Sequence, residues 1–371
     1  MATPAGNDPP EGDATTNDGP GSANRNPLFE IKDVPGMGKG MIARVDIARG
    51  TTIHTEKPLV VGPSRGGKNV ANSLGYIEMV FSVNSGDDSP SIDIIKALPK
   101  DKQRQFFSLS DSSHSHGSGK IRGIWVTNSL PVMIPDPSNF SLPREAVALT
   151  MSRVNHSCQP NSLLRYDEGW YQLKALRPIR AGEQVTITYK DYIHQTTSQW
   201  RRRGLEERYV ECKCEVCLRV AAGDVISDVR RDLIAIVTEA AQFGCPLSFY
   251  DPQLRLTRCR MLICLLNAEF PAGEAAEQVL QAYKDALDIA IAHGDCARAS
   301  VFARRMLGLI PLVGDAASGP GANGFWEMVA DQPRRHPSWR ECSSRWDTTL
   351  RAIPQNLSEG DFENWLWRQR F

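Results

Sequence analysis

The sequence lacks an excess of charge of either sign. Its 371 residues include 43 lysines and arginines and 43 aspartates and glutamates, so the formal net charge at pH 7 is zero. Surfaces that bind nucleic acid or membranes usually carry a basic excess, so overall charge gives no strong sign of either partner. The run Arg201–Arg203 is one local basic cluster, and its usual interpretation is a solvated helix face.

Long apolar segments are also missing. The chain has no run of about 18 apolar residues, so we expect no membrane span. Its first residues contain no apolar core of a secretory signal. Nine cysteines are an odd number in a chain without an export signal, which favours reduced thiols or metal ligands over a disulfide framework. We therefore predict a cytoplasmic or nuclear protein.

The texture of the chain changes near residue 27. Residues 1–26 are mostly small and polar, cannot bury enough apolar surface to fold, and are predicted to be disordered. Short alternating segments then predict a series of hairpins over residues 27–195. An inserted region over about 62–120 is mixed, with helical turns expected in Ile92–Phe107. Strands are expected again from Ile121.

After residue 224 the apolar pattern takes a helical period. Helices are expected near 227–243 and 252–268, and a later apolar stripe should end at Gly294. These patterns predict a helical C-terminal domain over 224–371, preceded by a cysteine-rich segment over 196–220. The expected fold class is α+β, with a β-rich first domain of small sheets.

Three cysteines lie within six residues of one another. Cys212, Cys214 and Cys217 form a C-x-C-x-x-C pattern, and thiolates this close together suit zinc, which takes four tetrahedral ligands. The best fourth donor is Cys158, which lies in an unusual polar stretch, Arg153–Asn161. The alternative is four ordinary free cysteines. The other cysteines are expected to be small buried hydrophobic residues; they are Cys245, Cys259, Cys264, Cys296 and Cys342.

Four segments together resemble one family. Asn155–Asn161 (NHSCQPN) and Gly182–Tyr189 (GEQVTITY) resemble signatures of SET-domain lysine methyltransferases. Cys212–Cys217 resembles the zinc-binding post-SET segment, and the glycine-rich turn Gly36–Gly40 resembles the opening hairpins. All four occur in the family's order, and the resemblance covers about residues 27–217.

Within that family the chain looks most like the SET-and-MYND proteins and the fungal-type short SET proteins. One departure is clear: residues 60–120 contain no cysteine, so the MYND zinc finger that interrupts the domain in the first group is expected to be absent. Partner binding that such a finger would confer is not expected here.

The resemblance implies a site for S-adenosylmethionine, a substrate channel and structural zinc. Tyr189 is implied as the catalytic residue, and Tyr192 and Tyr209 as channel walls. The implied cofactor-binding residues are Met37, Gly38, Lys39, Asn155, His156 and Tyr189. The implied zinc ligands are Cys158, Cys212, Cys214 and Cys217.

The expected activity is methyl transfer from S-adenosylmethionine to a lysine of another protein, histone or non-histone. The alternatives are a weak or inactive SET scaffold and an adaptor that binds protein partners through its helical domain. Asn155, His156 and Tyr189 are all present, which favours activity. The sequence predicts no oligomeric state.

Overall fold

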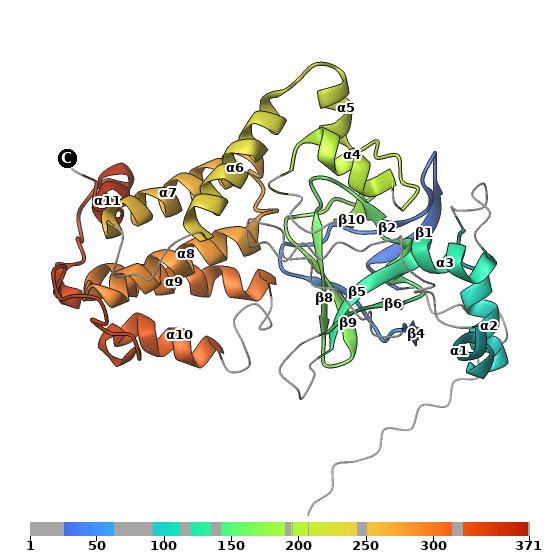
Figure 1. Cartoon of the computed structure of the whole chain (residues 1–371), viewed down its shortest axis with the longest axis horizontal. Helices are drawn as coiled ribbons and strands as arrows, with labels where there is room; N and C mark the ends of the chain where they lie inside the picture. Colours follow the sequence, from blue (N-terminus) through green and yellow to red (C-terminus); the bar gives the residue numbers. More distant parts are fainter. Residues whose placement is uncertain are drawn as a thin grey trace, which may run out of the picture.

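The protein has a β-rich part and a helical part that lie side by side (Figure 1). The computed structural model describes residues 26–62, 92–111, 119–134, 142–189, 194, 196–206, 208–242, 251–313 and 322–369. The expected disordered segment, residues 1–26, lies outside the described residues except for Asn26. The predicted α+β class, with small sheets followed by helices, is confirmed.

One sheet has the strand order β1-β2-β10-β7. Its strands are β1 (Phe29–Val34), β2 (Gly38–Ala43), β7 (Asn155–His156) and β10 (Gln184–Ile187). The turn between β1 and β2 holds Gly36 and Gly38 at φ of 72° and 69°, a left-handed region that glycine enters without steric cost. Because β10 pairs with β2 on one side and β7 on the other, this sheet joins the opening hairpin to both later signatures.

Two further sheets complete the β-rich part. The order β3-β9-β8 comprises β3 (Thr52–Glu56), β8 (Ser162–Asp167) and β9 (Trp170–Ala175). The order β4-β6-β5 comprises β4 (Val60–Val61), β5 (Ser129–Ile134) and β6 (Leu142–Val147). Met41, Leu173 and Val185 are fully buried in the shared core. The Tyr171 hydroxyl donates to the Leu130 carbonyl at 3.0 Å and so ties β9 to β5.

Three short helices pack beside the β4-β6-β5 sheet. They are α1 (Ile92–Ala97), α2 (Lys100–Phe107) and α3 (Lys120–Asn128). The helical turns expected over Ile92–Phe107 are confirmed, but the strand expected from Ile121 is wrong, because α3 comes first and β5 begins at Ser129. Ile124 and Trp125 are buried against Phe106, and this pairing of apolar faces favours the helix over a strand.

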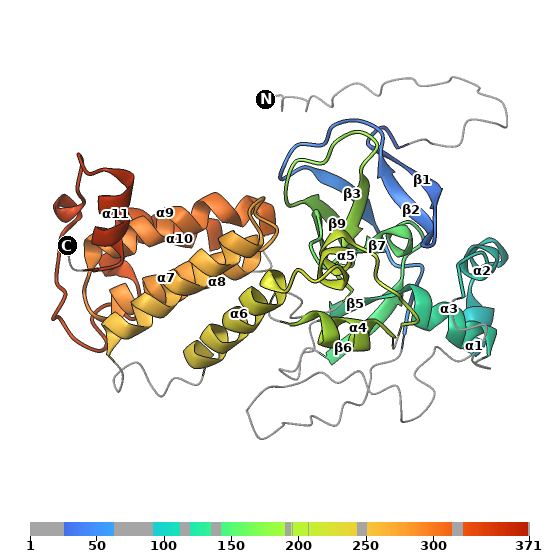
Figure 2. The ribbon, with the colours of Figure 1, turned by 90° about the horizontal axis from the view of Figure 1, so that it is seen from above.

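Most of the described residues that follow β10 are helical (Figure 2). After α4 (Ser198–Glu206) and α5 (Glu215–Ala221), the helices are α6 (Ile226–Gln242), α7 (Pro252–Glu269), α8 (Ala276–Ala292), α9 (Cys296–Val313), α10 (Ala322–Asp331) and α11 (Glu359–Leu366), with short 3-10 turns at Met151–Arg153, Pro333–Arg335 and Leu350–Ala352. α6 and α7 fall where helices were expected, and α8 ends just before Gly294. No helix within the described ranges has both the length and the apolar character needed to cross a membrane.

Candidate functional site

β7 and β10 bring the two signature segments together. Asn155 lies opposite Thr186, and His156 opposite Ile187, in parallel register. Tyr189 follows β10, and its backbone N–H donates to His156 Nδ1 at 3.0 Å. The rings of His156 and Tyr189 lie with centroids 5.4 Å apart. Three of the expected site residues are therefore neighbours in space.

The Tyr189 side chain is held by its hydroxyl. The hydroxyl donates to the Val154 carbonyl at 2.8 Å, one residue before Asn155. Burial raises the pKa of this phenol to about 12, although the nearby Arg208 guanidinium acts in the opposite direction. Tyr189 is therefore neutral at pH 7. Because its proton is committed to Val154, its oxygen lone pairs face any incoming group as acceptors.

Both ring nitrogens of His156 are engaged. Nδ1 accepts from a backbone N–H, a group that can only donate, so the proton of the neutral ring lies on Nε2. Nε2 lies 3.4 Å from the Cys158 sulfur. The ring is buried, and it joins the Tyr189 backbone to the cysteine cluster.

Gly40 marks a close approach between β2 and β7. A Cβ at this position would lie 2.6 Å from Val34 Cγ2 and 2.9 Å from Asn155 Nδ2, so a larger residue would push Asn155 away. Among the described residues, the side-chain nitrogens of Asn155 and Gln184 are buried and find no acceptor. Buried donors are rarely left without an acceptor in folded proteins, and a bound ligand can supply one.

The hairpin formed by β1 and β2 lies next to Asn155, because Gly40 is part of β2. Met37 is half-buried, while Gly38 and Lys39 are exposed at the turn, where Lys39 pairs with Asp33 at 3.2 Å. A carboxylate or a nucleoside offers the oxygen and nitrogen acceptors that the two amide nitrogens lack. These residues therefore fit S-adenosylmethionine, which carries both.

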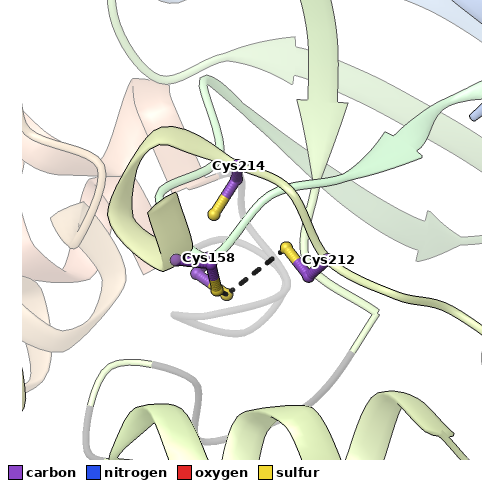
Figure 3. Close-up of side chains that lie close together, drawn as sticks. Cys158, Cys212 and Cys214 are labelled. Atoms are coloured by element: carbon purple, nitrogen blue, oxygen red, sulfur yellow. Dashed lines mark hydrogen bonds between the residues drawn. The ribbon is translucent and has the colours of Figure 1, made fainter. Parts of the chain in front are cut away.

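Four cysteine sulfurs form a cluster at the end of the site (Figure 3). The ligand atoms of Cys158, Cys212, Cys214 and Cys217 all lie within 4.8 Å of one another. Cys158 Sγ is 3.9 Å from Cys212 Sγ and 3.6 Å from Cys217 Sγ. Tetrahedral zinc with bonds of about 2.3 Å would place its sulfur ligands about 3.8 Å apart. The group can therefore hold a zinc ion.

The crowded thiols compete for their protons. Hydrogen bonds with Cys212 and the other two thiols, together with burial, raise the pKa of Cys158. Hydrogen bonds from Cys158 and Cys212 lower the pKa of Cys217 to about 7. A cation at the centre would remove this competition by stabilising all four thiolates.

Of the two residues expected to form channel walls, Tyr192 and Tyr209, the structure describes only Tyr209. Tyr192 lies outside the described residues. Tyr209 follows α4 in a left-handed conformation, with φ of 56°, and is 38% exposed. Its neighbour Arg208 anchors the segment by donating to the Ser129 carbonyl at 2.9 Å and pairing with Glu145 at 3.1 Å. The positive charge of Arg208 is also the one that acts on the pKa of Tyr189.

From the sequence, two buried arginines, Arg201 and Arg231, were not assigned to the region of the cysteine cluster. Arg201 was interpreted as part of a solvated cluster, which is wrong for this residue, since only 2% of it is exposed. The helical period contained the signal, because Ser198, Arg201 and Leu205 share the buried face of α4. Arg231, which is fully buried in α6, had no sequence signal that pointed to the site.

A family model matches part of the chain. The family model for the SET domain matches residues 38–190, which include β2, β7, β10 and Tyr189. The chain therefore contains a SET domain, and the predicted family resemblance is confirmed.

Several curated proteins are similar to the chain. The chain is 27% identical over 281 residues to histone-lysine N-methyltransferase set5 of Schizosaccharomyces pombe, covering 75% of this chain and 76% of that protein. It is 42% identical over 69 residues to histone-lysine N-methyltransferase SMYD3 of Mus musculus, covering 18% of this chain and 16% of that protein. The second match therefore concerns only a short shared segment.

A solved structure also aligns with the chain. It is the crystal structure of the SET domain of LSMT bound to lysine and AdoHcy, with 14% identity and a TM-score of 0.28, covering 93% of this chain and 96% of that one.

Proposed function

We propose that this protein transfers a methyl group from S-adenosylmethionine to a lysine side chain of another protein. The observation that carries the proposal is the juxtaposition of Tyr189, Asn155 and His156, with the Tyr189 hydroxyl fixed on the Val154 carbonyl. The relatedness to histone-lysine methyltransferases supports the reaction type. Histone or other protein lysines are the proposed substrates, and the cytoplasm or nucleus the proposed location.

The proposed cofactor residues have distinct parts. Met37, Gly38 and Lys39 would contact the cofactor through the hairpin backbone, which glycine leaves open. The side-chain amide of Asn155, which lies next to Gly40, would donate a hydrogen bond to the cofactor. Since both ring nitrogens of His156 are engaged, this residue would contact the cofactor through its main chain and position Tyr189 through its ring.

When bound, S-adenosylmethionine would supply a methyl group from a positively charged sulfur. The lysine nitrogen would form the new bond to the methyl carbon, and the neutral thioether would be the leaving group. The Tyr189 oxygen, an acceptor because its proton is committed to Val154, would receive an N–H of the lysine and aim its lone pair. The oxygen does not take the proton, because its phenol is neutral at pH 7. The lysine proton departs to water.

Lysine must lose a proton before it can attack. With an ordinary pKa of about 10.4, its neutral form at pH 7 costs roughly 4.6 kcal/mol. A narrow, partly apolar channel formed in part by Tyr209 and Tyr192 would lower that pKa by disfavouring the charged form. Alignment of the nitrogen with the methyl group would contribute further to the rate.

Zinc, on this proposal, has a structural role. All four of its positions would be filled by cysteines, which leaves no open position for chemistry. The ion would join the Cys158 loop to Cys212–Cys217 and so hold Tyr209 beside the site.

A scaffold or adaptor that binds partners through its helices is the second candidate. An exposed apolar row on α6 favours it; its members are Ile226, Val229, Leu233 and Ile236, each 43–60% exposed. Deleting residues 225–371 would not separate the two candidates cleanly, because α6 also contributes Arg231 to the Cys158 loop.

Thermal unfolding with S-adenosylmethionine tests the proposal. A ligand present at about 100 times its dissociation constant should stabilise the native chain by about 2.7 kcal/mol. The expected result is such a shift, followed by transfer of radiolabelled methyl groups to a lysine of a lysate protein identified by mass spectrometry. No shift at saturating concentrations would favour the scaffold.

A further inference from the structure

The Cys158 loop is held by the C-terminal helices. Arg231 of α6 donates from Nη2 to the Cys158 carbonyl at 3.0 Å, and its side chain is fully buried. On its other side Nε pairs with Glu269, at the end of α7, at 2.9 Å. The guanidinium also stacks on the Phe270 ring, 4.9 Å from its centroid. Together these contacts hold the Arg231 side chain in a single conformation.

A second contact reaches the next residue of the same loop. The Gln159 side-chain amide donates to Glu274 at 3.0 Å, just beyond α7. Glu274 also lies 3.8 Å from Arg177 of the β-rich part. The loop that contributes the fourth cysteine is therefore held at two successive residues, at Cys158 by Arg231 of α6 and at Gln159 by Glu274 just beyond α7.

A second buried arginine approaches the sulfurs from α4. Arg201 Nη1 donates to the Thr196 carbonyl at 2.5 Å and lies 3.4 Å from Asp228 of α6. Its Nε and Nη2 are buried and have no hydrogen-bond partner among the described residues. Burial lowers the pKa of Arg201, but the charges of Cys158, Cys217 and Asp228 outweigh this and raise it overall. The Nε and Nη2 groups of Arg201 are thus buried donors without an acceptor in the described part of the chain. Asp228, which Arg201 contacts, lies one helical turn from Arg231, whose side chain reaches the Cys158 carbonyl.

Both arginines meet at one face of α6, because Arg231 lies on that face and Arg201 contacts Asp228 there. Asp228 and Arg231 are three residues apart on this helix and so point the same way. Asp228 also accepts from the Ser198 backbone N–H at 2.8 Å and the Ser198 hydroxyl at 2.6 Å, which fixes the start of α4. A zinc ion with four thiolates carries a formal net charge of about −2, and buried charge of that kind needs donors around it. The two guanidinium groups are such donors.

We propose that Arg201 and Arg231 are positioning residues of the metal centre, through which the helical C-terminal part holds the Cys158 loop in place. Arg201 supplies N–H groups to the Cys158 thiolate, and Arg231 fixes the backbone of the same residue. Because His156 bridges Cys158 and Tyr189, the helical part also sets the position of Tyr189, a consequence that rests on the proposed function.

Zinc retention by the full chain tests the inference without reference to methyl transfer. Zinc released to the chromophoric chelator 4-(2-pyridylazo)resorcinol would be followed for Arg201→Met and Arg231→Met. Loss of a group that supports a metal ligand typically lowers affinity about 10- to 100-fold, and a change of this size is expected for each. The controls are Arg202→Met, the exposed neighbour on α4, and Arg230→Met, whose weaker ion pair at 3.7 Å is with the same Glu269.

Conservative variants separate positioning from folding. Arg201→Lys keeps the charge and should retain zinc better than Arg201→Met. Arg231→Lys keeps the pair with Glu269 but cannot also reach the Cys158 carbonyl, so its retention should be intermediate. With cobalt in place of zinc, Arg201→Met should move the sulfur-to-cobalt charge-transfer band to longer wavelength, because the thiolate loses a stabilising donor. A global folding defect would not produce that shift in folded protein.

Wild-type zinc retention in both methionine variants would overturn the inference, as would equal losses in the two controls or a full chain that binds no zinc. A chain that transfers no methyl group yet loses zinc faster in the Arg201 and Arg231 variants would contradict the proposed function and leave this inference standing.

Discussion

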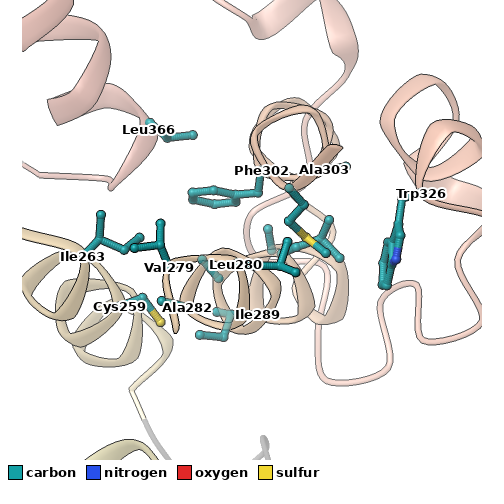
Figure 4. Close-up of a cluster of buried hydrophobic side chains, with 14 of the residues drawn as sticks. Cys259, Ile263, Val279, Leu280, Ala282, Ile289, Phe302, Ala303, Trp326 and Leu366 are labelled. Atoms are coloured by element: carbon teal, nitrogen blue, oxygen red, sulfur yellow. The ribbon is translucent and has the colours of Figure 1, made fainter. Parts of the chain in front are cut away.

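The two parts of the molecule are buried in different ways. In the helical part a large cluster of buried apolar side chains, with Ile263, Leu280, Phe302 and Leu366, is packed between α7, α8, α9 and α11 (Figure 4). Asp295 and Arg298 are also buried there, as an ion pair. At the site, by contrast, the buried ring of His156 is held by a directed contact, because its Nδ1 accepts from the Tyr189 backbone N–H. Apolar contacts tolerate small shifts, whereas directed polar contacts do not. The helical core should therefore govern stability, and the polar site should govern activity.

Metal removal should have the largest effect on the polar side of this comparison. Stripping zinc with a chelator, or replacing Cys214 by Ser, should abolish methyl transfer, because the Cys158 loop and the segment that follows Tyr209 lose their common anchor. Metal content by atomic absorption and transfer of labelled methyl groups would be measured on the same sample. Full transfer by protein shown to be free of zinc would refute the structural role.

Truncation in the apolar core should act on stability alone. Phe302 is fully buried between α8 and α11, so Phe302→Ala should lower the free energy of unfolding by about 3–5 kcal/mol. Denaturant unfolding would measure this. Zinc content per folded molecule should stay unchanged, and its loss would show that the two parts are less separate than their packing indicates.

The junction between the parts should respond to acid. His194 packs against Phe270 with ring centroids 4.8 Å apart, and burial, aided by the Arg231 charge, lowers the pKa of His194 to about 3. The unfolded chain takes up this proton near pH 6.5 and the native chain does not. The contribution of His194 is therefore complete above about pH 6.5 and falls by up to about 1.4 kcal/mol per pH unit below it.

The variant His194→Gln checks this slope. Denaturant unfolding between pH 7 and pH 4 should show a shallower loss of stability for the variant than for the wild type. Identical slopes would remove His194 from the account of the junction.

The smallest expected changes in free energy come from a glycine-to-alanine substitution made once in each part of the molecule. Gly40→Ala should displace Asn155 and weaken S-adenosylmethionine binding about 10-fold or more, a cost of roughly 1.4 kcal/mol. Gly308→Ala lies in α9, where a Cβ meets nothing within 4 Å, and should stabilise the chain by about 0.5–1 kcal/mol. Calorimetric titration and thermal unfolding would measure the two, and equal cofactor affinity in both variants would contradict the close-approach argument.

The cysteine cluster and the helical part of the molecule could both be predicted from the sequence. The spacing of Cys212, Cys214 and Cys217 and the unusual setting of Cys158 identified the cluster, because closely spaced thiols among polar residues are typical of a metal site. The helical period identified α6 and α7, since each places apolar residues on one buried face, such as Ile234 and Val237 in α6 and Leu256 and Ile263 in α7. The roles of Tyr189 and Asn155 were inferred from resemblance and stay proposals.

Other features could not be read from local pattern. Arg231 reaches Cys158 across 73 residues, and no local rule indicates which distant carbonyl a buried arginine will find. The helix α3 was missed because its apolar residues, Ile121, Ile124 and Trp125, fit a strand as well as a helix until Phe106 and Ile95 supply the opposing face. Long-range contacts decide both cases.

One matched pair of variants tests the central claim most directly. Tyr189 and Tyr171 each donate a hydroxyl to a backbone carbonyl, at 2.8 Å to Val154 and at 3.0 Å to Leu130, and only the first lies beside Asn155 and His156. Turnover of labelled methyl groups onto a lysine substrate would be measured for Tyr189→Phe and Tyr171→Phe. The account predicts a fall of about 100-fold or more for Tyr189→Phe and near wild-type turnover for folded Tyr171→Phe. Unchanged turnover in Tyr189→Phe, or an equal loss in both variants, would contradict it.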